Sequence, residues 1–219
     1  MSTHTVRPAP RHPALLLAVG AALLAQALPA ASAADAPDPS SRAYARLLAV
    51  TVCGTCHGTL GNNSQPKFPR LAGQNATYLG AQLVAFRSQA RGDPDAVAYM
   101  WGMASELDDA TINALAAYYV AQQAEPGRAA EAALRAQGRE VYEQGVPAQG
   151  VPACSSCHGK DAHGLQDFPR LAGQHRQYVL KQLASFQSNM RNVAIMHGVA
   201  QNLRVAEMEA VAAYVEGLP

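Results

Sequence analysis

Apolar positions recur along this chain with the spacing of amphipathic helices. Leu79, Leu83 and Phe86 lie at positions i, i+4 and i+7, which places them on one face of a helix. The same spacing returns a hundred residues later, at Val179, Leu183 and Phe186. No stretch alternates convincingly between apolar and polar residues with the period of two that is typical of a strand. The pattern therefore predicts an all-α chain.

Further helices are predicted at both ends of this repeated unit. An apolar stripe follows a capping aspartate, Asp108 or Asp109, and it has a counterpart near the end of the chain. The two stripes are Ile112, Leu115, Ala116 and Tyr119, and Met208, Val211, Ala212 and Val215. Helices over residues 40–52 and 128–144 lead into the two cysteine motifs described next.

A cysteine motif and the residues after it occur twice. The string "CGTCH", which begins at Cys53, returns as "CSSCH" 101 positions later. The string "FPRLAGQ" at residues 68–74 is repeated without change at 168–174. This self-similarity indicates a tandem duplication. The Pro126-Gly127 pair marks the boundary, which gives two helical domains at residues 34–125 and 126–219.

The first 33 residues are predicted to be a signal peptide that is cleaved near Ala33. A basic start containing Arg7 and Arg11 precedes an apolar run over residues 14–28, and Ala31-Ser32-Ala33 supplies the small residues of a cleavage site. The apolar run is shorter than the ~20 residues that a membrane-spanning helix needs. We therefore expect an exported, periplasmic protein without a membrane anchor.

The charge balance excludes a nucleic-acid partner. After removal of residues 1–33, which contain two arginines and no acidic residue, 15 basic and 16 acidic residues remain. A nucleic-acid-binding protein would carry a clear excess of basic residues.

Each Cys-x-x-Cys-His motif is typical of covalent haem attachment. Thiols three residues apart in a helical turn can each form a thioether with one haem vinyl group, and the adjacent histidine can bind the iron. Thiol redox chemistry would need a βαβ context, and structural zinc would need four ligands that here belong to separate domains. The attachment residues are predicted to be Cys53, Cys56, Cys154 and Cys157, holding two covalently bound haem c groups, with His57 and His158 as proximal ligands.

The repeat also suggests the sixth ligand of each iron. Met100 and Met103 precede Leu107, and Met196 precedes Leu203. At the offset of 96 that relates these segments, Met100 aligns with Met196, whereas Met103 aligns with Val199. We therefore predict Met100 and Met196 as distal ligands and keep Met103 as the substitute; packing in the core is the ordinary alternative for a methionine.

Three further features carry weaker expectations. The backbone carbonyls of Pro69 and Pro169 are candidates to accept the second N–H of each proximal histidine. Arg70 and Arg170 could bind haem propionates. Three histidines have no counterpart in the other copy and are predicted to lie at the surface: His163, His175 and His197.

Taken together, the paired motifs, the two "FPRLAGQ" strings and the late methionines resemble the cytochrome c4 family of di-haem bacterial cytochromes, over the whole of residues 34–219. The resemblance implies two class I, mitochondrial-cytochrome-c-like domains related by a pseudo-twofold axis, with the propionate edges of the haems facing each other. It also implies single-electron transfer from a respiratory complex to a terminal oxidase. The same cysteines, histidines and methionines match the family's haem-binding positions.

Three functions remain after this reading. The leading prediction is a periplasmic electron carrier and not an enzyme, because no acid–base or nucleophile constellation lies outside the haem motifs. A di-haem enzyme of the peroxidase or thiosulfate dehydrogenase type is the alternative, and it would need one labile iron ligand. A third function is that of an electron-entry module bound to a membrane complex, which leaves peripheral membrane association open.

Overall fold

The computed structural model describes Met1 and residues 39–219, and the residues from 39 onward belong to one compact unit. Helices and turns make up this part of the chain, and the one β-bridge within it joins Val146 to Val151. The predicted all-α class is confirmed. The predicted signal peptide at residues 1–33 lies outside the residues that the structure describes, apart from Met1.

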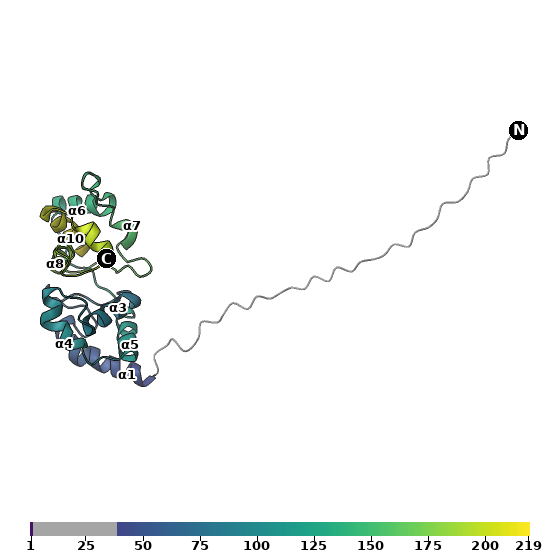
Figure 1. Ribbon diagram of the computed structural model, residues 1–219, viewed down its shortest axis with the longest axis vertical. Coiled ribbons are helices and arrows are strands. Elements are labelled where there is room, and N and C mark those ends of the chain that lie inside the picture. The colour runs from purple at the N-terminus through teal and green to yellow at the C-terminus, as the bar shows by residue number, and fades with distance from the viewer. Residues whose placement is uncertain (2–38) are drawn as a thin grey trace. The chain divides into compact units, whose positions relative to one another are not determined.

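The first half contains two short π-helical segments as well as α-helices (Figure 1). Its elements are α1 (Pro39–Leu48), η2 (Ala49–Cys53), α2 (Gly54–His57), α3 (Ala76–Arg87), η3 (Ala96–Met100), α4 (Trp101–Ala104) and α5 (Asp109–Val120). The helix predicted over residues 40–52 therefore ends earlier, at Leu48, and passes through π-helical turns into the cysteine motif. π-helical turns of this kind are frequent at functional sites.

The second half repeats the order of α-helices without the π-helical turns. Its elements are α6 (Ala132–Gln144), η4 (Pro147–Gln149), α7 (Ser155–His158), α8 (Arg176–Gln187), α9 (Ala194–Ala200) and α10 (Val205–Glu216). The helix predicted to start at residue 128 begins at Ala132 instead, because a coil segment follows the Pro126-Gly127 pair.

Each half is held together by its first and last helices. In the first half α1 packs on α5, and in the second α6 packs on α10 (Figure 1). Small residues lie at both crossings: Ala45 and Ala49 are fully buried, and Gly138 is buried against Ala210. Small side chains let two helix backbones approach closely, so the helix crossing positions the cysteine motif that follows α1 or α6.

Side-chain caps fix where α3 and α5 of the first half begin. Asn75 Oδ1 accepts a hydrogen bond from the Tyr78 N–H at the start of α3, at 3.0 Å. Asp108 Oδ1 accepts from the Thr111 N–H at the start of α5, at 2.7 Å, which confirms Asp108 as the predicted cap. Each such bond satisfies one of the backbone donors that a helix start leaves unpaired.

The prediction that His175 is a surface residue was wrong. Its exposed fraction is 4%, and its Nε2 lies 3.1 Å from both the backbone oxygen and the side-chain oxygen of Asn63, in the other half. Burial, followed by the nearby charge of Arg70, lowers the pKa of His175. The residue lies at the interface between the two halves, which we call the seam. A comparison of the two copies of the repeat cannot show which residues lie at this interface. His163 is exposed, as predicted, and His197 is half-buried.

Replacing Gly138 by alanine should destabilise the protein by about 1 to 3 kcal/mol, the usual cost of overpacking. A Cβ at this position would lie 2.0 Å from the backbone oxygen of Ala210, so α6 and α10 would have to separate. Gly198→Ala in α9 is the matched control, since a Cβ there meets nothing within 4 Å and alanine favours a helix by about 0.5 to 1 kcal/mol. Denaturant unfolding of the haem-loaded protein measures both, and equal effects would contradict the packing argument.

Candidate functional site

Each cysteine pair lies at the start of a short helix that ends at the histidine; this helix follows α1 and η2 directly in the first half, and a loop separates it from α6 in the second. Cys53 is the last residue of η2 and precedes α2, and Cys154 precedes α7. Within residues 39–219 the four cysteines form no disulfide, and no three metal-binding side chains of the His, Cys, Asp or Glu type gather in one place.

Burial disfavours the thiolate form of the first cysteine of each motif. It raises the pKa of Cys53, and it raises the pKa of Cys154 to about 11. A thiol of high pKa is a poor thiolate ligand and a slow partner in disulfide exchange. The cysteine environment is thus unlike that of a redox-active Cys-x-x-Cys pair.

Both motif histidines are held by one backbone hydrogen bond. Nδ1 of His57 lies 2.9 Å from the carbonyl oxygen of Pro69, and Nδ1 of His158 lies 2.9 Å from that of Pro169. This confirms the predicted role of the two proline carbonyls. Because a carbonyl oxygen can only accept, Nδ1 carries the hydrogen. Burial lowers the pKa of both histidines, so each imidazole is neutral and keeps a lone pair on Nε2 for a metal.

The loop after each histidine is shaped to bring the proline back to it. Gly58 and Gly159 end the short helices with φ of 77° and 82°, a region that residues with a Cβ rarely adopt. The ring of Phe68 then meets His57 edge to face at 6.1 Å, and Phe168 meets His158 at 6.0 Å. The first two residues of the repeated "FPRLAGQ" string therefore orient the imidazole.

A cavity of about 910 Å³ is lined by both histidines. Its wall is mainly apolar and also includes Cys53, Cys56 and the methionines Met100, Met103 and Met196. Met100 and Met196 are half-buried, whereas Met103 has an exposed fraction of 58%. The structure thus brings the predicted iron ligands of each half to one cavity, and it places the substitute Met103 at the more open part of its wall.

The lining fits a large flat cofactor that carries acceptor oxygens. Two buried guanidinium nitrogens in the described part of the chain lack a hydrogen-bond partner, Arg170 Nε and Arg191 Nε, whereas the buried Tyr119 hydroxyl interacts with the Cys53 thiol. All three side chains line the cavity. Buried polar atoms are normally satisfied. An apolar cofactor body with carboxylates, such as haem and its propionates, would fill the space and supply partners.

Sequence reasoning missed a buried polar cluster where the halves meet. The Arg91 guanidinium donates to Gln82 Oε1 at 2.8 Å and, across the seam, to Gln182 Oε1 at 2.7 Å. Arg191 mirrors this, donating to Gln182 Oε1 at 2.8 Å and to Gln82 Oε1 at 2.7 Å. Tyr78 accepts from Arg191 at 2.8 Å. These residues recur in both copies, and that repetition of polar side chains was the signal that could have identified the cluster.

One carboxylate breaks the symmetry of this cluster. Asp93 Oδ2 accepts from Arg91 Nε at 2.7 Å, and both side chains are almost fully buried. The equivalent position in the second half is Val193, and Arg191 Nε is unpaired. Burial raises the pKa of Asp93, but the Arg91 charge and hydrogen bond outweigh it and hold this pKa below its usual value. The two halves therefore differ in local charge.

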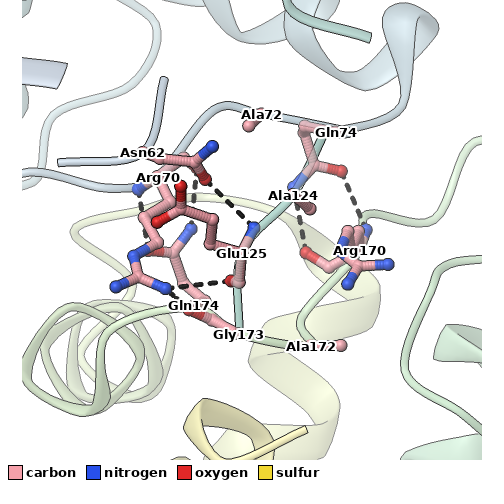
Figure 2. A pocket seen from close by; sticks show the side chains of 10 residues that line it. All are labelled: Asn62, Arg70, Ala72, Gln74, Ala124, Glu125, Arg170, Ala172, Gly173 and Gln174. Atoms are coloured by element: carbon pink, nitrogen blue, oxygen red, sulfur yellow. Dashed lines mark hydrogen bonds between the residues drawn. The ribbon is translucent and has the colours of Figure 1, made fainter. Parts of the chain in front are cut away.

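The guanidinium of Arg70 is held by backbone carbonyl oxygens from both halves. Its guanidinium donates to the carbonyl oxygens of Asn63, Glu125 and Gly173, at 3.0 to 3.3 Å. Arg170 donates to the carbonyl oxygen of Pro219 at 2.7 Å, although its Nε remains unpaired. Figure 2 shows the small pocket between the halves that these side chains line. Arg70 thus joins backbone segments because carbonyl oxygens surround its donors.

Comparison with known proteins gives the family. The family model for cytochrome c matches twice, at residues 43–122 and 136–219. The chain is 39% identical to cytochrome c4 of Stutzerimonas stutzeri over 77% of this chain and 85% of that one. The crystal structure of reduced cytochrome c4 from Pseudomonas stutzeri superposes with a TM-score of 0.73, at 37% identity, covering 84% of this chain and 100% of that one. The chain belongs to the cytochrome c4 family.

As a member of the cytochrome c4 family, this chain is a di-haem electron-transfer cytochrome with two cytochrome c domains, as predicted. The Cys53/Cys56 and Cys154/Cys157 motifs fit two covalently bound haem c groups. Its partners are redox proteins. Among the described residues, none of the helices combines the length and apolar character needed to cross a membrane.

The prediction that excluded an enzyme was wrong. Thiosulfate dehydrogenase from Marichromatium purpuratum superposes with a TM-score of 0.73 at 34% identity, covering 81% of this chain and 40% of that one. A relative from Thiomonas intermedia, 34% identical over 88% of this chain and 85% of that one, is named thiosulfate dehydrogenase electron acceptor. The exclusion relied on the lack of an acid–base constellation, but haem iron can carry redox catalysis without one. Cytochrome c4 relatives still predominate and indicate electron transfer.

Replacing Asp93 by asparagine should destabilise the protein by about 3 to 5 kcal/mol, because it leaves the buried Arg91 charge without its carboxylate. The control is Asp109→Asn, which breaks the Arg87–Asp109 pair on a side chain that is 81% exposed. Loss of an exposed pair costs about 1 kcal/mol or less. Urea unfolding of the haem-loaded variants compares the two, and a loss at Asp93 no greater than at Asp109 would contradict a buried ion pair.

Proposed function

We propose that this cytochrome carries single electrons between two haems that each have one histidine and one methionine ligand. The proposed ligands are His57 and Met100 in the first half and His158 and Met196 in the second. The observation that carries the proposal is the cavity, since it is lined by both histidines and both methionines. Each histidine donates Nδ1–H to a proline carbonyl, which leaves Nε2 as its ligating atom.

Cys53, Cys56, Cys154 and Cys157 are proposed to hold the haems through thioethers. When bound, each haem supplies a one-electron iron couple. The protein excludes water from it: Leu79, Leu83 and Phe86 in the first half, and their counterparts in the second, line the cavity. Thioether sulfur is a soft ligand that favours ferrous iron and raises the reduction potential. One histidine and one methionine on each iron would suit both haems to single-electron exchange.

The cellular role follows from the same proposal. Residues 1–33 direct export and are removed near Ala33, and residues 34–125 and 126–219 form one haem domain each. The mature protein works in the periplasm, where a respiratory complex donates electrons and a terminal oxidase accepts them. The apolar run at residues 14–28 and the small residues before Ala33 support export.

The ligand assignment can be tested with three methionine variants. Met100→Ala and Met196→Ala should each remove about half of the methionine-to-ferric-iron charge-transfer absorption, because each removes one of two thioether ligands. Met103→Ala is the control and should retain the full absorption, since Met103 is the more exposed methionine of the same wall. Undiminished absorption in either of the first two variants would reject that ligand.

A second candidate role is that of electron acceptor in thiosulfate oxidation. Two relatives with the name thiosulfate dehydrogenase electron acceptor favour this role. One is the Thiomonas intermedia protein, and the other, from Stutzerimonas stutzeri, is 44% identical over 40% of this chain. In this role the oxidised protein should be reduced rapidly by thiosulfate once a thiosulfate dehydrogenase is added. Stopped-flow absorption of the haem bands measures the rate with and without the dehydrogenase. No acceleration by the dehydrogenase would contradict this role.

A further inference from the structure

The histidine of each half is connected to a glutamine of the other half through a single peptide group. The Pro69 carbonyl that accepts from His57 belongs to the same peptide group as the Arg70 N–H. That N–H donates to Gln174 Oε1, in the second half, at 2.9 Å. The path from His57 to Gln174 therefore consists of two hydrogen bonds and one peptide group.

The second half repeats this path in the opposite direction. The Pro169 carbonyl accepts from His158, and the Arg170 N–H of the same peptide group donates to Gln74 Oε1 at 2.8 Å. Figure 2 shows both glutamines reaching across to the arginine backbone of the other half. The two paths are reciprocal, since Gln74 is connected to His158 of the second half and Gln174 to His57 of the first.

The orientation of each glutamine amide is fixed by its partners. Gln174 Oε1 accepts from the N–H groups of Arg70 and His175, and its Nε2 donates to the Arg70 carbonyl at 2.9 Å. Gln74 makes the equivalent bonds with Arg170 and Asn75. A flipped amide would place its NH₂ against two N–H donors. Both side chains are buried, with exposed fractions of 6% and 7%.

We propose that Gln74 and Gln174 are positioning residues that tune the haem of the opposite half through the proximal histidine. This inference rests on the proposed ligation of each haem by one histidine and one methionine, since the methionine band is also its reporter. An acceptor on the peptide N–H polarises the peptide group and makes its carbonyl oxygen more negative, because hydrogen bonds in a chain strengthen one another. A more negative carbonyl draws the Nδ1 hydrogen more strongly, gives the imidazole more anionic character and favours ferric iron. Each glutamine therefore lowers the reduction potential of the haem across the seam.

The proposal also explains why the repeated "FPRLAGQ" string ends with glutamine. Its proline carbonyl accepts from the histidine of its own half, and its arginine N–H donates to the glutamine of the other half. Its own glutamine accepts from the arginine N–H of the other half. A single isolated domain would leave this glutamine only the N–H of the next residue, Asn75 or His175, as a partner. The string thus forms a reciprocal connection between the two halves.

The test uses the haem-loaded full chain with one methionine-ligated haem left as a reporter. In a Met196→Ala parent, the charge-transfer band reports the first-half haem alone, and its loss on reduction gives the midpoint potential. Gln174→Ala in this parent should raise that potential, and Gln74→Ala should leave it unchanged. In a Met100→Ala parent the pattern should be reversed. Gln174→Glu, which keeps an acceptor oxygen for the Arg70 N–H, should not raise the potential.

The effects of the two alanine variants on the midpoint potential of one reporter haem distinguish tuning of that haem from general loosening of the seam. Both alanine variants remove an equivalent set of hydrogen bonds between the halves, so general loosening would shift one reporter equally in both. The comparison also avoids the difference that Pro69 accepts a further bond from Asn63, at 3.1 Å. Equal shifts, a shift caused only by the glutamine of the reporter's own half, or no shift would overturn the proposal. A parent without the band would instead reject the methionine ligand itself, and the proposal with it.

Discussion

The hydrogen bond from each motif histidine to a proline carbonyl is the interaction on which the site depends. It fixes the tautomer, since the carbonyl can only accept, and it leaves Nε2 available for the iron. Its geometry requires the positive φ of Gly58 and Gly159, which turn the chain back toward the imidazole. Burial works in the same direction because it lowers the pKa of both histidines and keeps them neutral.

The two halves share this design but not their electrostatic surroundings. Asp93 pairs with Arg91 in the first half, while Val193 occupies the equivalent position and leaves Arg191 Nε unpaired. Two π-helical segments, η2 and η3, occur in the first half, and the second half has α-helix or coil at the equivalent places. The two halves therefore have similar sites whose surroundings differ, at Asp93 and Val193 in charge and at η2 and η3 in backbone. A protein that passes electrons between two haems needs such a difference if one direction is to be favoured.

The seam between the halves contains a buried cluster of polar side chains. Arg91, Arg191 and their glutamine partners are buried there, and each arginine donates to both halves. Buried polar groups are stable only when their hydrogen bonds are complete, and such bonds require a defined geometry. The cluster thus favours one arrangement of the halves over others that would bury the same apolar area.

The sequence by itself determined the all-α class, the duplication and the haem motifs, because all three depend on local spacing. The 3.6-residue periodicity at Leu79, Leu83 and Phe86 and the three-residue spacing of Cys53 and Cys56 need no knowledge of distant contacts. It also suggested the proline carbonyls, since Pro69 follows His57 within one loop. Only the tertiary structure decided which residues meet across the seam. His175 was expected at the surface and is buried against Asn63, and Arg70 binds backbone carbonyls. A repeat shows that Gln74 and Gln174 are equivalent, but it cannot show that each serves the other half, because that depends on how two folded domains pack.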